Sequence, residues 1–192
     1  MKQSLFMGAK ISGFRYNCQS HGRYVKTRFG TFYLEETPRG LREVQFPREV
    51  KTHKQRKPRG KSRLLMKTGK LLKNYLEGKP VSFRRLPIDL SDFTEFEKKV
   101  LKALARVRYG QKRSYRDLAK AAGASGASRA VGSVMRKNRL PIILPCHRII
   151  CTNGKLGKYS QGLPWKKCLL GIEKQFLRRR IKIQAFDLSK AG

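Results

Sequence analysis

Hydrophobic positions follow two different periods along the chain, and the period changes near residue 92. Up to about residue 50, β-branched and aromatic residues alternate with charged ones, and Gly30 and Pro38-Arg39-Gly40 supply turns. This alternation predicts short strands over residues 13–16, 24–29, 31–34 and 43–46. A leucine-rich stretch over residues 64–76, closed by Gly78 and Pro80, then predicts a helix.

From residue 93 the hydrophobic period is helical. Thr94-Glu95-Phe96-Glu97 and Ser114-x-x-Asp117 are capping-box patterns, and each predicts the start of a helix that a glycine later ends. Small residues over 123–126 separate the second of these helices from a third, expected from near Ala127 to about Lys137. Two short helices joined by such a turn favour a helix-turn-helix. A last helix is expected from Trp165 to about Arg180.

These elements predict an α+β protein with two domains. A small strand-rich N-terminal domain, a sheet plus a helix, is expected over residues 1–85, and a linker over 86–92. A mainly helical C-terminal domain, with the helix-turn-helix and the active site, is expected over 93–180. A basic tail is expected over 181–192.

The charge of the chain favours a polyanionic partner. Its 46 Lys and Arg face only 12 Asp and Glu, a formal net charge of +34. Acidic residues are absent between Glu49 and Glu77 and again between Asp117 and Glu173. Nucleic acid is the first candidate partner, because it neutralises such self-repulsion, and an acidic membrane surface is the weaker alternative. No apolar run is long enough to span a bilayer and no signal-peptide core is visible, so we expect a soluble, cytoplasmic protein.

The third helix carries small and basic residues opposite Val131 and Val134. These are Ser128, Arg129, Gly132, Ser133 and Arg136. A smooth basic face suits a helix pressed against a nucleic-acid backbone. The alternative is a helix that packs against another helix through its small residues.

The cysteines give little sign of a metal site or a disulfide framework. None of the four lies in a CxxC pattern. Cys18-x-x-His21 and Cys146-His147 each offer half of a zinc site, but their spacing matches no familiar module, so we expect no metal and no cofactor.

The stretch LPCHRII, residues 144–150, places Cys146 beside His147 within an apolar run. A buried cysteine is usually an inert small hydrophobe. Here Pro145 rules out a regular strand ladder, so His147 is free to approach the thiol directly or through one water. Glu173 shares the apolar face of the last helix, where a carboxylate is costly unless paired. Together the three residues predict a relay that lowers the thiol pKa and delivers a thiolate. The glycine-punctuated loop that follows, residues 153–162, is either a plain surface hairpin or the wall of a pocket.

With these motifs the chain resembles the O6-alkylguanine–DNA alkyltransferases, also called methylated-DNA–protein-cysteine methyltransferases. The resemblance runs in order from about Phe93 to Glu173, through SYRDLA, SRAVGSVMRKN, LPIILPCHRII and GKLGKYSQGL. It implies a DNA repair protein that moves the alkyl group from O6-alkylguanine, and from O4-alkylthymine, onto its own cysteine once. It also implies a base-flipping mechanism on double-stranded DNA, with no obligate protein partner and a monomer that can bind DNA cooperatively.

The resemblance implies a role for each matching residue. Cys146 takes the alkyl group, His147 accepts the thiol proton through a water, and Glu173 holds His147. Asn138 is a hinge between the helix-turn-helix and the active site. Tyr115 drives the target nucleotide out of the stack, and Arg129 fills the gap that it leaves. The alkylguanine pocket is formed by Tyr115, Met135, Leu156, Gly157, Tyr159, Ser160 and Gln161.

One departure and one alternative function remain open. Gln161 stands where a glycine is common in the family, so acceptance of a bulky group such as benzyl does not follow from the resemblance. The alternative is a non-catalytic helix-turn-helix protein that binds DNA lesions without removing them. Members of that reader class lack the nucleophile, whereas Cys146 is present.

Overall fold

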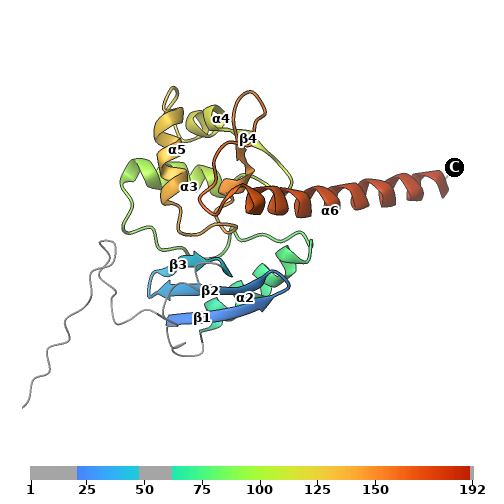
Figure 1. Ribbon diagram of the computed structural model, residues 1–192, viewed down its shortest axis with the longest axis horizontal. Coiled ribbons are helices and arrows are strands. Elements are labelled where there is room, and N and C mark those ends of the chain that lie inside the picture. The colour runs from blue at the N-terminus through green and yellow to red at the C-terminus, as the bar shows by residue number, and fades with distance from the viewer. Residues whose placement is uncertain (1–20, 48–61, 191–192) are drawn as a thin grey trace, which may run out of the picture.

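The computed structural model describes residues 21–47 and 62–190, with side chains up to Arg178. Figure 1 shows a small sheet with one helix below a cluster of helices, and a long last helix that projects from the body. The α+β class expected from the sequence is therefore confirmed, with strands first and helices after. The strand expected at residues 13–16 lies outside the described residues.

The first part is a three-stranded antiparallel sheet in the order β1-β2-β3. Its strands are β1 (His21–Thr27), β2 (Gly30–Thr37) and β3 (Gly40–Gln45), joined by two-residue turns. Gly40 has φ +133°, and a Cβ there would lie 2.5 Å from the carbonyl carbon of Pro87, so this turn needs glycine. Helix α2 (Arg63–Leu76) packs on the sheet through its leucines, and the Ser62 side chain caps it by accepting from Leu65 N.

The helix-turn-helix region forms as its capping boxes predict. Helix α3 (Glu95–Ala105) and helix α4 (Tyr115–Ala121) each begin with both capping-box hydrogen bonds in place. Helix α5 (Ser128–Lys137) follows after a turn in which Gly123 and Gly126 have positive φ. The Glu97 carboxylate of α3 also accepts from Lys137 Nζ at 2.6 Å, which ties the start of α3 to the end of α5.

A very short parallel pair joins this region to the cysteine. β4 (Arg113–Ser114) pairs with β5 (Ile149–Ile150) directly after a 3₁₀ turn, η1 (Cys146–Arg148). Ser114 is the N-cap of α4, so the pair holds the start of the helix-turn-helix beside the residues that follow the cysteine. Two-residue strands leave no periodic signal, and the sequence did not predict this pair.

Two expected segments differ from what the structure contains. The last helix, α6 (Leu163–Lys190), begins slightly early and continues through most of the expected basic tail at residues 181–192. Neither glycine nor proline interrupts residues 172–190, so nothing in that stretch ends the helix. The expected linker at 86–92 packs on β3, where Leu41 N donates to Pro87 O and Asp89 N donates to Leu41 O. The domain boundaries themselves stay a prediction.

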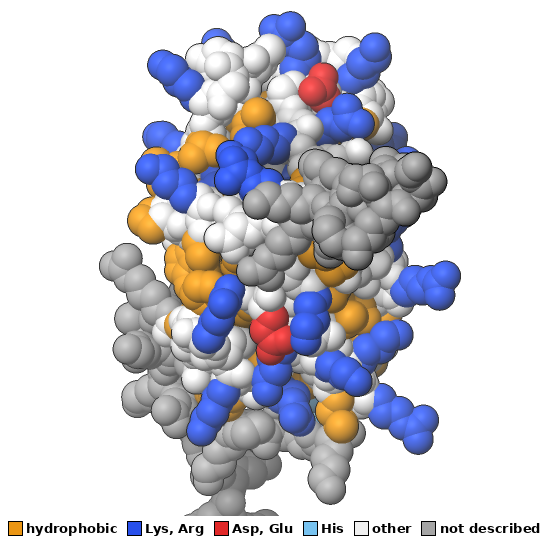
Figure 2. All heavy atoms as spheres, turned by 90° about the vertical axis from the view of Figure 1, so that its right-hand side faces the viewer, with side chains coloured by type: hydrophobic (Ala, Val, Ile, Leu, Met, Phe, Trp, Pro, Cys, Tyr) orange, Lys and Arg blue, Asp and Glu red, His pale blue; other side chains and the backbone are white. Residues whose placement is uncertain are grey.

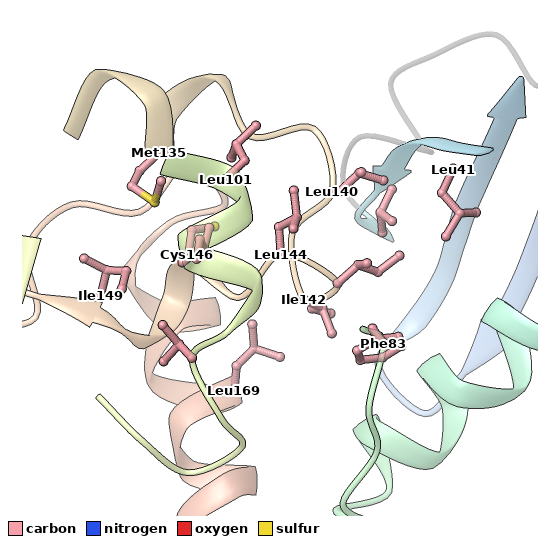
Figure 3. Packing of buried hydrophobic residues seen from close by; sticks show 14 of the residues in the cluster. Leu41, Phe83, Leu101, Met135, Leu140, Ile142, Leu144, Cys146, Ile149 and Leu169 are labelled. Atoms are coloured by element: carbon pink, nitrogen blue, oxygen red, sulfur yellow. The ribbon is translucent and has the colours of Figure 1, made fainter. Parts of the chain in front are cut away.

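The two halves share one hydrophobic core. Figure 3 shows buried side chains running from Leu41 and Phe83 to Ile149 and Leu169 across both parts. Trp165, at the start of α6, packs edge-on against Phe46 of the N-terminal part, with ring centroids 4.7 Å apart. Phe32 lies 5.9 Å from the same indole. None of the helices over the described residues is long and apolar enough to span a bilayer.

Trp165 should therefore carry a large share of the contact between the two halves. Replacing Trp165 with Ala removes an aromatic side chain from a packed interface, and we expect the free energy of unfolding to fall by about 3 kcal/mol. Urea denaturation followed by far-ultraviolet circular dichroism measures this. Met66→Ala is the control, because Met66 is 51% exposed and should change stability by less than about 0.5 kcal/mol. Equal effects in both variants would contradict the role of Trp165.

Candidate active site

Cys146 is buried at the end of the segment that leaves α5. Asn138 caps α5, and its amide Nδ2 donates to Leu144 O at 2.9 Å and to Cys146 Sγ at 3.1 Å. The Asn138 Oδ1 accepts from Leu140 N at 3.0 Å, which closes the turn. Asn138 thus connects the helix-turn-helix to the thiol, where the resemblance placed its hinge. Ile142 of the same turn has φ +73°, an uncommon conformation for a β-branched residue.

Glu173 and His147 meet in the interior of the molecule. Their side chains are 1% and 0% exposed, and His147 Nε2 lies 2.9 Å from Glu173 Oε1. Arg148 Nη2 donates to the same oxygen at 2.9 Å, and Gly110 N donates to Glu173 Oε2 at 2.8 Å. The structure therefore brings together the histidine and glutamate of the predicted relay and adds Arg148 to them, while the cysteine precedes His147 in the same 3₁₀ turn.

The carboxylate of Glu173 is ionised despite its burial. Hydrogen bonds and charge from His147 and Arg148 outweigh desolvation and lower the pKa of Glu173 to about 2. Burial lowers the pKa of His147, against the opposing effect of Glu173. The resting pair is therefore a neutral imidazole beside a carboxylate.

This state fixes which nitrogen of His147 carries the proton. An ionised Glu173 accepts only, so Nε2 must be the N–H donor in their hydrogen bond. Nδ1 then holds the lone pair, and this buried atom has no hydrogen-bond partner among the described residues. It is the one position on the ring at which the imidazole can take a proton.

The pKa of the Cys146 thiol differs from the expectation. The relay was expected to lower the pKa of Cys146, but burial raises the pKa of the resting thiol. The hydrogen bond from Asn138 and the positive charge of Lys166 oppose that rise. The resting cysteine is thus stored as a thiol, and a base must remove its proton during the reaction.

Lys166 is a site residue that the sequence reasoning missed. Its side chain is fully buried, and Nζ donates to Ile149 O at 2.6 Å and to Leu156 O. The two bonds tie α6 to the strand after the cysteine and to the predicted pocket loop. A signal was available, because Lys166 lies on the same helical face as Leu169 and Glu173, where an unpaired charge is costly.

Tyr75 of α2 was also missed. Its hydroxyl donates to Glu173 Oε1 at 2.7 Å and lies 3.0 Å from His147 Nε2. In the sequence Tyr75 belongs to the apolar stripe of its helix and looks like a core residue. A buried tyrosine hydroxyl usually has a partner, but the sequence does not say which one.

The predicted DNA-contacting residues lie together on the outer side of α5. Arg129 and Arg136 are exposed, and Ser128, Gly132 and Ser133 are partly exposed beside them. A Cβ added at Gly132 would meet no described atom within 4 Å, so no described element packs against this glycine. Gly132 therefore gives no support to the alternative of helix packing through small residues. Figure 2 shows Lys and Arg over both halves of another face, so the positive charge extends beyond the helix-turn-helix.

The predicted pocket residues are only partly brought together. A Cβ at Gly157 would lie 3.5 Å from the Tyr115 hydroxyl and 3.1 Å from Cys151 Sγ, so Tyr115 and the loop are in contact. Burial raises the pKa of Tyr115, which keeps its hydroxyl a donor. Tyr159 packs against the core, Met135 is buried within it, and Ser160 is exposed. Leu156 and Gln161 are half-buried.

The described residues contain no group of three or more His, Cys, Asp or Glu placed to hold a metal. Cys146, Cys151 and Cys168 are free thiols, and Cys18 lies outside the described residues.

Two family profiles match the two parts of the chain. Residues 95–175 match the 6-O-methylguanine DNA methyltransferase DNA-binding domain, and residues 21–90 match its ribonuclease-like domain. A methylated-DNA–protein-cysteine methyltransferase from Methanosarcina barkeri is 42% identical over 110 residues, which are 56% of this chain and 66% of the relative. A relative of the same name from Methanosarcina acetivorans is 49% identical over 80 residues, 42% of this chain and about half of the relative.

Solved structures match over more of the chain. The OGT of Mycobacterium tuberculosis in complex with DNA has a TM-score of 0.70 and 33% identity, and the match covers 81% of this chain and 94% of that one. The O6-methylguanine-DNA methyltransferase of Pyrococcus kodakaraensis has a TM-score of 0.60 and 27% identity, covering 80% and 98%. The fold and the site thus define a protein with a buried cysteine beside a helix-turn-helix. The chain belongs to the methylated-DNA–protein-cysteine methyltransferase family.

The low pKa of Glu173 predicts a pH-dependent stability. Its pKa is about 2 in the folded protein and lies near the ordinary value of a glutamate in the unfolded chain. The contribution of Glu173 is therefore present above about pH 4.5 and is lost as the pH falls toward 2, about 3 kcal/mol in all. Urea denaturation at a series of pH values should show this fall in the free energy of unfolding.

Glu173→Gln should remove the part of the pH dependence of the free energy of unfolding that comes from Glu173. It should also lower stability at neutral pH by about 3–5 kcal/mol, because Arg148 is left buried without its counter-charge. Glu77→Gln is the control: Glu77 is exposed and its pKa is lowered chiefly by the neighbouring Lys79, so the variant should keep the part of the acid dependence that comes from Glu173. A slope unchanged in Glu173→Gln would contradict the assigned pKa.

Proposed function

We propose that this protein repairs DNA by transferring the alkyl group of O6-alkylguanine irreversibly to Cys146. The observation that carries the proposal is the buried thiol held by Asn138, next in sequence to an imidazole that is itself held by an ionised Glu173. The family membership and the DNA complex of the M. tuberculosis relative support it. O4-alkylthymine is a second substrate under the same proposal.

The chemistry follows from the proton positions. The Sγ of Cys146 attacks the alkyl carbon, the S–C bond forms, and the C–O6 bond breaks with its electron pair going to the guanine. The thiol proton passes to Nδ1 of His147 through a water, and Glu173 stabilises the imidazolium that forms. Tyr115 donates a hydroxyl hydrogen bond to the leaving base, and Ser160 donates one to O6. The thioether product is stable, so each molecule reacts once.

DNA is engaged through the outer face of α5. Its small and basic residues suit a minor groove, and Arg129 fills the space of the extruded nucleotide. Contacts to phosphates by the many Lys and Arg predict that affinity falls steeply with salt. The protein acts as a monomer that can bind cooperatively along DNA, needs no cofactor, and associates with the nucleoid through this DNA binding.

The direct test is incubation with a duplex that contains O6-methylguanine, followed by peptide mass analysis. The peptide that holds Cys146 should gain the mass of one methylene, with one equivalent per protein. Cys146→Ala should still bind the duplex and gain nothing, whereas the control Cys168→Ala should react like the wild type. Binding with no adduct on any cysteine would favour the non-catalytic lesion reader instead.

Arg129→Ala tests the proposed flipping step. Extrusion from a duplex costs a few kcal/mol, so the variant should repair a duplex at least about tenfold more slowly. Repair of the same lesion in a single strand should change much less. Arg136→Ala removes an equal charge from the same helix and should weaken both substrates alike. Equal losses on duplex and single strand in Arg129→Ala would contradict the proposal that Arg129 fills the space of the extruded nucleotide.

A further inference from the structure

Tyr75 reaches the predicted relay from the other half of the molecule. It lies on α2, 72 residues before His147 and 98 before Glu173, and its side chain is 0% exposed. The other side chains that bond Glu173, those of His147 and Arg148, belong to the C-terminal part. The hydroxyl of Tyr75 contacts both partners of the His147–Glu173 pair at once.

The three polar atoms form a closed arrangement in which each proton has a defined place. Tyr75 donates its proton to Glu173 Oε1, so its oxygen faces His147 Nε2 as an acceptor. Burial and the charge of Glu173 raise the pKa of Tyr75 well above its usual value, so the hydroxyl keeps its proton. Nε2 of His147 is then surrounded by two acceptors. If His147 carried its proton on Nδ1 instead, the lone pair of Nε2 would face the oxygen lone pairs of Tyr75 and Glu173 and be repelled by both.

We propose that Tyr75 is a positioning residue for alkyl transfer, whose hydroxyl locks His147 with its proton on Nε2 and leaves Nδ1 to take the proton of Cys146. This rests on the proposed function for the thiol. It assigns a part in the reaction to the N-terminal half of the chain, in which the family resemblance placed no site residue.

Tyr109 provides a matched control in the same aromatic cluster. Its ring packs edge-on against that of Tyr75 at 5.8 Å, but its own buried hydroxyl has no hydrogen-bond partner among the described residues. Tyr75→Phe and Tyr109→Phe therefore each delete one buried hydroxyl oxygen and keep the ring. Only the first deletion removes a bond to the relay.

The pH profile of methyl transfer separates positioning from packing. The charged and titratable groups around His147 are Glu173 and Lys166 of α6, Tyr75 of α2, and Cys146 and Arg148 of its own turn. Without the Tyr75 donor, the full charge of Glu173 acts on His147. In Tyr75→Phe the acid limb of the rate should therefore move to higher pH, and the plateau rate on O6-methylguanine duplex should fall about tenfold. Tyr109→Phe should match the wild type in both, and a Tyr75→Phe profile that matches Tyr109→Phe overturns the proposal.

A second measurement needs no variant at Tyr75. The chain has only three histidines, so ¹⁵N spectra of the imidazoles are simple to assign after replacing His21 and His53 with Gln. At neutral pH the wild-type His147 should show a protonated Nε2 and an unprotonated Nδ1. A proton on Nδ1 overturns the proposal even if Tyr75→Phe fails to fold. If the wild-type protein transfers no methyl group at all, the proposed function fails, whereas the tautomer still reports whether His147 is in the state that its contacts with Tyr75 and Glu173 require.

Discussion

The buried carboxylate of Glu173 is the interaction on which the site depends. In a chain with 46 basic and only 12 acidic residues, one of the few acids lies in the interior and accepts from His147, Arg148, Tyr75 and Gly110. A lone carboxylate there would be neutralised by burial. Because four partners converge on the carboxylate, it stays ionised. Its hydrogen bonds connect α6 to α2, to the turn of the cysteine and to Gly110 after α3. The same atoms that stabilise the fold hold the imidazole of the residue that follows the cysteine.

Local sequence signals predicted the elements that depend on nearby residues. The two capping boxes started α3 and α4 where expected, because each box needs only residues three apart. The order of sheet, helix and helix-turn-helix followed from hydrophobic period and turn residues. The alkyltransferase family, first indicated by the motif around Cys146, is confirmed by the comparisons.

What the sequence did not reveal depends on contacts between distant residues. Tyr75 and Lys166 look like a core aromatic residue and a surface cation until the fold places their polar atoms against Glu173 and against backbone carbonyls. The β4–β5 pair is too short to leave a pattern. The pKa of the Cys146 thiol was expected to be lowered, whereas burial in the assembled core raises it. The helix continues through residues 181–190, where a basic tail was expected, because neither glycine nor proline interrupts it there.

The packing of Trp165 against Phe46 and Phe32 has an optical consequence. This is the single tryptophan of the chain, and it lies where the N-terminal sheet meets the start of α6. Its indole emission therefore reports on that one junction without any added label. It stands next to Lys166, which holds both the strand after the cysteine and the pocket loop. Movement of the loop around a bound base, or separation of the two halves, would change the surroundings of the indole and appear as a shift in fluorescence.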